Sequence, residues 1–185
     1  NFGGANIHVA GTYDLNGGLV PKNFTLLEGG KLANTGSALA DMGQRQIDSL
    51  TLEGDATVNA ASTITMIGSR YATAQVNLGS NTLTKNGAGV FQINNGNITG
   101  DGTIAVQEGE LRLFSYSNSA NMGTAADATF DVKGGATLRV DIGTTIGKIT
   151  TTAADAASNL ALGNGVTLIL GSTAESTSSI DNVSI

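Results

Sequence analysis

Four aspartates are spaced so that they could form one acidic site. Each precedes, by four to seven positions, an apolar residue of a set that recurs about every 26 residues. A repeating structure would place the four carboxylates along one edge, where they could bind Ca²⁺ or act as general acid and base. Aspartate is also favoured in turns, because its side chain bonds the local backbone, and we prefer this interpretation. The residues are Asp48, Asp101, Asp127 and Asp155, and the sequence leaves open whether they bind a cation.

Other catalytic or metal-binding groups are scarce. The chain has one histidine, His8, and no cysteine, so it lacks the residues of a Cys/His metal site. His8 lies between Ile7 and Val9 in an alternating segment, which predicts a surface position in a strand. We therefore expect no catalytic residue, no metal site and no cofactor, and we interpret the chain as non-enzymatic.

The segment 114–121 is the best candidate for ligand recognition, because it is the longest polar insertion that contains aromatic residues. Loops that leave a rigid repeat structure often carry recognition. Phe114 or Tyr116 could stack on a sugar ring, with Asn118 as a flanking amide. The alternative, which we favour for this segment, is that it packs a ring over the adjacent coil.

Two arginines extend the set of candidate ligand-binding residues. Arg112 and Arg139 occupy equivalent positions in neighbouring copies of the repeat. Like charges on adjacent strands are unfavourable unless a carboxylate or an anionic ligand lies between them. The simpler alternative, which we favour, is that both side chains extend into water.

A six-fold repeat of strand-like segments must position these residues. In each copy, apolar residues alternate with polar ones, which is typical of a strand with one buried face. Outward positions carry mainly small polar residues such as Thr25, Thr51 and Asn77. One apolar set, predicted to form a single ladder, consists of Leu26, Leu52, Leu78, Val106, Val132 and Leu162. A second predicted ladder consists of Leu32, Val58, Leu83, Leu111, Leu138 and Leu168.

This period and the composition predict an all-β fold. The 185 residues include 26 Gly, one Pro and no Trp, and 13% are charged. A nearly constant period of this length is typical of stacked repeats. We predict one domain over residues 1–185, a single-stranded right-handed parallel β-helix (β-solenoid) with coils of about 26–30 residues. Because the chain begins with Asn1, we expect a fragment that continues in its own polypeptide at one or both ends.

Charge and hydropathy limit the partners. The formal net charge of −6 disfavours nucleic acid as a partner. No apolar run approaches the length of a membrane-spanning helix, so we expect no membrane insertion by this segment.

The centre of the chain resembles a known bacterial repeat. Residues 83–94 are LTKNGAGVFQIN, residues 98–113 are ITGDGTIAVQEGELRL, and residues 130–140 are FDVKGGATLRV. The region 78–140 is similar to the autotransporter-associated β-strand repeat, also called the passenger-associated transport repeat, with Ile98 where the family usually has an aromatic residue. The resemblance implies a parallel β-helix in the passenger of a secreted or surface-displayed protein, with any outer-membrane anchor outside this segment.

We interpret the chain as a non-catalytic structural or adhesive segment of a bacterial secreted or surface protein. It would be a rigid stalk, or a module that contacts a glycan or a host surface. The alternative is an accessory or catalytic portion of a carbohydrate-active β-helix protein, of the polysaccharide lyase or glycoside hydrolase type. An aligned acidic cleft would favour the alternative, and a surface of small polar residues would favour the stalk.

Overall fold

The protein folds as a β-solenoid. The computed structural model describes residues 5–18, 21–38, 47–67, 74–115, 124–152, 157–171 and 183–184. Within these ranges every element is a strand, and every strand pair is parallel. This part of the chain accordingly offers no helix long and apolar enough to cross a membrane.

Most strands are short, as expected for coils that turn several times per repeat. The strands are β1 (Asn6–Val9), β2 (Thr12–Asp14), β3 (Asn23–Leu26), β4 (Lys31–Asn34), β5 (Ser49–Leu52), β6 (Ala56–Ala60), β7 (Ile64–Ile67), β8 (Gln75–Asn77), β9 (Thr82–Asn86), β10 (Val90–Asn94), β11 (Asn97–Thr99), β12 (Thr103–Val106), β13 (Glu110–Phe114), β14 (Ala125–Lys133), β15 (Thr137–Val140), β16 (Thr144–Thr152), β17 (Ser158–Leu162), β18 (Leu168–Leu170) and β19 (Val183–Ser184). Of these, β14 and β16 are the two longest.

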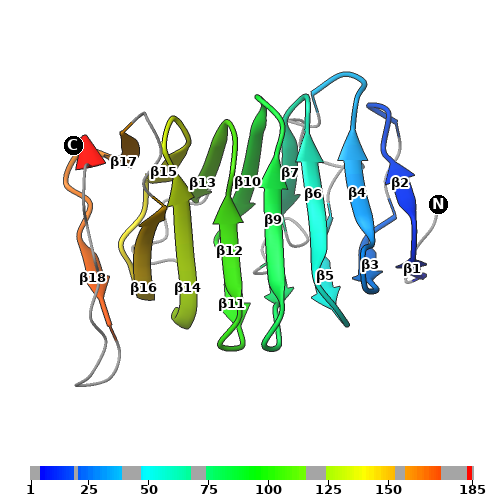
Figure 1. Ribbon diagram of the computed structural model, residues 1–185, viewed down its shortest axis with the longest axis horizontal. Helices are drawn as coiled ribbons and strands as arrows, with labels where there is room; N and C mark the ends of the chain where they lie inside the picture. The colour runs from blue at the N-terminus through cyan, green and yellow to red at the C-terminus, as the bar shows by residue number, and fades with distance from the viewer. Residues whose placement is uncertain are drawn as a thin grey trace.

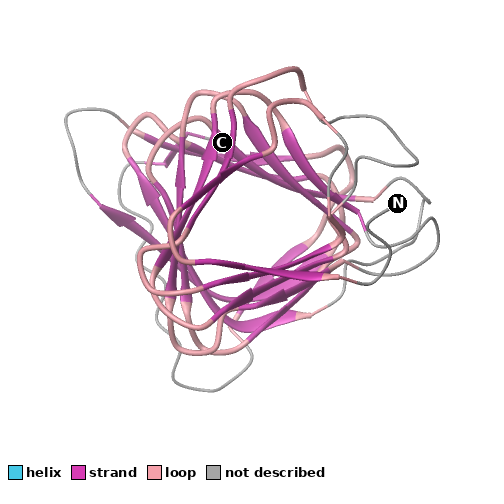
Figure 2. Ribbon diagram, turned by 90° about the vertical axis from the view of Figure 1, so that its right-hand side faces the viewer, coloured by secondary structure: helices cyan, strands magenta, loops and turns pink. Residues whose placement is uncertain are grey.

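Three parallel sheets form the sides of the solenoid. Sheet A has the order β1-β3-β5-β8-β11, sheet B has β2-β4-β6-β9-β12-β14-β16-β18, and sheet C has β7-β10-β13-β15-β17-β19. A complete coil contributes one strand to each sheet, as β8, β9 and β10 do in turn. The coils stack along the long axis, with β1 and β18 near opposite ends (Figure 1). Seen along that axis, the three sheets enclose a roughly triangular cross-section (Figure 2).

One apolar core fills the inside of this triangle. Strands such as β6 alternate strictly between buried and partly exposed residues, because successive side chains point to opposite faces. The inward residues form one cluster that continues from Val9 to Leu160. Its largest fully buried members include Phe24, Phe91 and Phe130. No single coil could bury these side chains alone, so stacking itself creates the core.

The first predicted ladder is wrong as a single column. Leu26 and Leu52 are paired in sheet A as predicted. Val106 and Val132 are also paired with each other, but in sheet B, and Leu162 belongs to sheet C. The sequence pattern had therefore joined inward residues from three different sides of the solenoid.

The second predicted ladder fails for the same reason. Leu32 and Val58 are paired in sheet B, whereas Leu111 and Leu138 are paired in sheet C. The prediction assumed two recurring strands per coil, but a complete coil has three. All three have similar apolar alternation, so strands of different sheets look equivalent in the sequence.

Coil length also varies more than the sequence pattern predicted. In sheet A, one turn of the solenoid leads from Asn23 to its partner Ser49. In sheet B, a shorter turn leads from Thr82 to its partner Thr103. The first coil is shorter still, because Asn6 is already paired with Asn23. The strands stay in register while the corner segments change length, which is how stacked repeats accept insertions.

Candidate functional site

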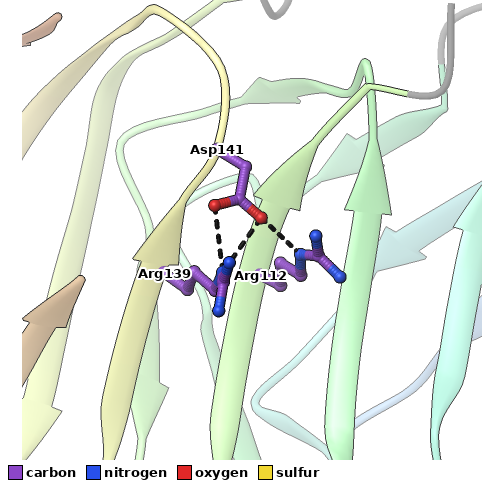
Figure 3. Close-up of polar contacts among 3 residues, drawn as sticks. All are labelled: Arg112, Arg139 and Asp141. Carbon is purple, nitrogen blue, oxygen red and sulfur yellow. Dashed lines mark hydrogen bonds and ion pairs between the residues drawn. The ribbon is translucent and has the colours of Figure 1, made fainter. Parts of the chain in front are cut away.

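Arg112 and Arg139 form a shared ion pair on the outside of sheet C. The two residues are directly paired between β13 and β15, and both guanidinium groups face the carboxylate of Asp141 (Figure 3). Arg112 donates from Nε to Asp141 Oδ2 at 2.6 Å. Arg139 donates from Nε to both carboxylate oxygens at 2.9 Å. Of the two alternatives considered for this pair, the structure shows the one with a carboxylate between the charges, that of Asp141, and the expectation that both side chains extend into water is wrong.

This arrangement places one negative charge between two positive ones. The Asp141 side chain is 16% exposed, and those of Arg112 and Arg139 are 34% and 44% exposed. Asp141 follows β15 directly, so its position depends on the end of the same strand that carries Arg139. The site could hold an anionic group near the outer ends of the guanidinium groups, but the Nε donors are already occupied.

Phe114 supports the arginine pair from the end of β13. Its side chain is buried, at 5% relative exposure, and the Arg112 guanidinium carbon lies 5.0 Å from the centre of its ring. This contact is a cation–π interaction that orients the arginine. The burial fits the packing alternative for this segment. Tyr116 and Asn118, the other predicted ligand-binding residues, lie outside the described residues.

The predicted acidic row does not form as one line. Asp101 and Asp127 each lie two positions before the paired Thr103 and Thr129, so these two carboxylates occupy equivalent positions on neighbouring coils. Asp48 instead precedes β5 of sheet A and pairs with Lys22 Nζ at 3.1 Å. Asp155 lies outside the described residues.

The prediction of an acidic row is wrong for the same reason as the predicted ladders. Because coil length varies, residues at a constant interval along the chain do not lie at the same corner of successive coils. Among the described residues, no group of three or more His, Cys, Asp or Glu side chains could hold a metal ion. The single histidine, His8, is exposed in β1 next to Thr25 of β3, in agreement with its predicted surface position.

A groove on the outer surface of sheet B was not predicted. Its volume is about 520 Å³. Polar side chains from successive coils form its walls. The lining residues are Lys31, Asn59, Thr84, Asn86, Gly87, Gln107, Glu108 and Lys133.

Three of these residues form what we call the amide row, Asn59, Asn86 and Gln107. Asn59 and Asn86 are paired between β6 and β9. Gln107 directly follows Val106, which is paired with Lys85, the residue before Asn86. The row therefore runs across three successive coils, parallel to the solenoid axis. The alternation of β6 and β9 could have revealed it, because each amide follows an inward residue.

Lys85 lies beneath the rim of the same groove and inside the core. It is fully buried, at the position that Val58 and Val106 occupy on the neighbouring coils. Nζ donates to the carbonyl oxygens of Gly87 at 2.6 Å and Glu108 at 2.7 Å. Burial lowers the pKa of Lys85 to about 8, against the opposing effect of the nearby Glu108 and Glu110 carboxylates. The ammonium thus joins the corner turns of two successive coils.

Comparisons with known proteins do not add to this description. No protein-family model matches the chain, no curated protein matches it, and no solved structure matches it.

Proposed function

We propose that this chain is a non-catalytic, rigid β-solenoid segment of a secreted or surface-displayed bacterial protein, similar to the passengers of autotransporters. It would act as a stalk that carries other parts of the polypeptide away from the surface. It would also contact a glycan or a host surface along one outer face.

The continuous core supports the stalk most directly. One apolar cluster extends from Val9 to Leu160, so bending the rod would separate packed side chains of neighbouring coils. The eight strands of sheet B, at about 4.8 Å per strand, give a rod roughly 35 Å long. A stack of this kind transmits force along its axis through every coil.

The outward residues support a contact role rather than catalysis. Those of sheet A include the paired Thr51 and Asn77, which are small and polar. Thr25, at the equivalent position of the preceding coil, was expected on the outer surface but is buried and bonded to Asn6. The two arginines of sheet C are held by Asp141. Polar sheet surfaces of this composition favour hydrogen bonding to hydroxyl-rich partners over acid–base chemistry.

Deletion of one coil tests the stalk. Removing residues 103–128 joins Gly102 to Thr129, and these ends are compatible because Thr103 and Thr129 are paired in register. We expect the variant to remain folded by circular dichroism, and small-angle X-ray scattering to show a shorter rod of unchanged cross-section. Loss of the fold or a change in cross-section would contradict a modular stalk.

A cleavage assay tests the absence of catalysis. The intact chain would be incubated with neutral and uronic-acid polysaccharides, and new reducing ends and unsaturated products would be measured. We expect neither product to form. Release of either product by the wild-type chain would favour the carbohydrate-active alternative.

A further inference from the structure

We propose that the amide row of sheet B binds one extended glycan strand that lies parallel to the solenoid axis. This inference deepens the glycan contact of the proposed function and rests on it. It assigns that contact to Asn59, Asn86 and Gln107, not to the segment after β13 or to the arginine pair.

The spacing of the row suits a linear polymer. Its three amides lie on successive coils, so they are separated by the strand spacing of about 4.8 Å. This distance is close to the length of one unit in an extended sugar chain. Each coil can therefore present one amide to one successive sugar, and the contacts continue in phase along the groove.

The amide groups are available for such contacts. Asn59, Asn86 and Gln107 are only partly exposed, yet their side chains form no hydrogen bond with one another or with other described residues. A side-chain amide offers both donors and an acceptor. It can thus bond to hydroxyl groups, which also donate and accept, without leaving either partner unsatisfied.

The backbone at the corner keeps the groove open. Gly87 has φ +84, and a Cβ at this position would lie 2.7 Å from Asn59 Oδ1. Its amide nitrogen donates to Glu108 Oε2 at 2.9 Å, which fixes the Glu108 side chain at the rim. A larger residue at position 87 would displace the Asn59 amide from the row.

The charges of the groove favour a glycan that carries carboxylates. Lys133 continues the row on the next coil, because it follows Val132, the partner of Val106. Lys31 lies at the other end of the lining, and Glu108 is the one acidic residue among the lining residues. The lining therefore carries a positive charge, in contrast to the net charge of −6 of the whole chain.

The arginine pair is the weaker candidate for this ligand. The Nε atoms of Arg112 and Arg139 already bond to Asp141, so that ion pair has a structural purpose. The groove has a volume of about 520 Å³, enough for several polar groups of a bound chain.

The test uses the full chain and immobilised oligosaccharides of defined length, from disaccharide to about hexasaccharide, in a neutral β-linked glucose series and a uronic-acid series. The row is removed by the triple variant Asn59→Ala, Asn86→Ala, Gln107→Ala. The matched control is Gln92→Ala, because Gln92 is an outward amide of β10 in sheet C, next to Arg112. Circular dichroism and thermal unfolding establish that each variant is folded.

We expect wild-type affinity to rise with oligosaccharide length until the row is spanned, and to be higher for the uronic-acid series. The triple variant should lose about tenfold or more in affinity, as expected for several lost hydrogen bonds, and Gln92→Ala should bind normally. Lys133→Gln should reduce the preference for the uronic-acid series over the neutral series.

Two results would overturn the inference in different ways. Binding that survives in the triple variant but is lost in Arg112→Ala, Arg139→Ala would move the glycan to sheet C, and the glycan contact of the proposed function would stand. Absence of binding by the folded wild-type chain to every oligosaccharide would exclude the amide row as a glycan site. The proposed stalk function would then be tested by the coil deletion alone.

Discussion

Lys85 donates from Nζ to the carbonyl oxygen of Glu108, on the next coil, at 2.7 Å from inside the apolar core. A second bond reaches the Gly87 carbonyl. A charged ammonium has three donors, but a neutral amine still has two, which matches the two carbonyl acceptors. Deprotonation of Lys85 would therefore remove the buried charge and keep both hydrogen bonds.

Stability should therefore depend on pH through Lys85. Its pKa is about 8 in the folded chain, against 10.5 for an ordinary lysine. Between these values the unfolded chain binds more protons than the folded one, so the free energy of unfolding increases with pH. Urea unfolding from pH 7 to pH 11 should show a gain of roughly 3 kcal/mol from this group, absent below about pH 8.

Lys85→Met isolates that contribution, because it removes the titrating group and keeps an unbranched side chain. The difference in unfolding free energy between wild type and this variant should increase over the same pH range. Lys133→Met is the matched control, since it removes an exposed lysine of the same sheet and should show no such change. A wild-type minus Lys85→Met difference that stays constant from pH 7 to pH 11 would refute the assignment.

Asp141 should stabilise the fold by separating two like charges. Asp141→Asn removes the negative charge between Arg112 and Arg139 and leaves two guanidinium groups on adjacent strands. Because both arginines are partly exposed, we expect a loss of only about 1–2 kcal/mol. Chemical denaturation in low salt should show this loss, and 1 M NaCl should reduce it by screening.

Two further variants separate this effect from a general change in net charge. Asp101→Asn changes the net charge equally at an exposed turn and should cost little. Arg139→Ala should destabilise wild type, but it should restore stability in the Asp141→Asn background because it removes the repulsion. Additive effects of the two substitutions would show that the three residues do not act as a unit.

The class of fold could be predicted from the sequence because stacking requires a similar apolar pattern in every coil. Alternating apolar residues identified the strands, and their recurrence identified the solenoid. Pairs on the same side were also predicted, such as Leu26 with Leu52 and Arg112 with Arg139. The continuous columns through all six copies of the repeat were predicted incorrectly, because the length of a coil varies at its corners. A constant interval along the chain can lead to the next coil of the same sheet or to a different sheet.

Lys85 and the groove were missed for a physical reason that concerns side-chain type. In Thr82–Asn86, alternation places Lys85 on the same face as Leu83, but a charged residue is ordinarily expected at the surface. Its burial depends on two carbonyl groups that only the folded corner brings together. The amide row of the groove likewise requires the register of three coils, which the sequence does not specify at residue level.

The corners should be the least tolerant part of the fold, because successive coils approach most closely there. Gly100 has φ +93, and a Cβ at this position would lie 2.2 Å from the carbonyl oxygen of Gly79 on the preceding coil. Gly100→Ala combines an unfavourable backbone conformation with a backbone clash, so we expect a loss of about 2–4 kcal/mol in urea unfolding.

Gly11→Ala is the comparison that tests this explanation, since a Cβ at position 11 would have no neighbour within 4 Å. There the substitution restricts only the unfolded chain, and stability should stay the same or rise by up to about 1 kcal/mol. Equal losses at the two positions would mean that glycine content as such matters. A loss confined to Gly100 would show that the positive φ and the close contact between adjacent coils together determine where glycine is required.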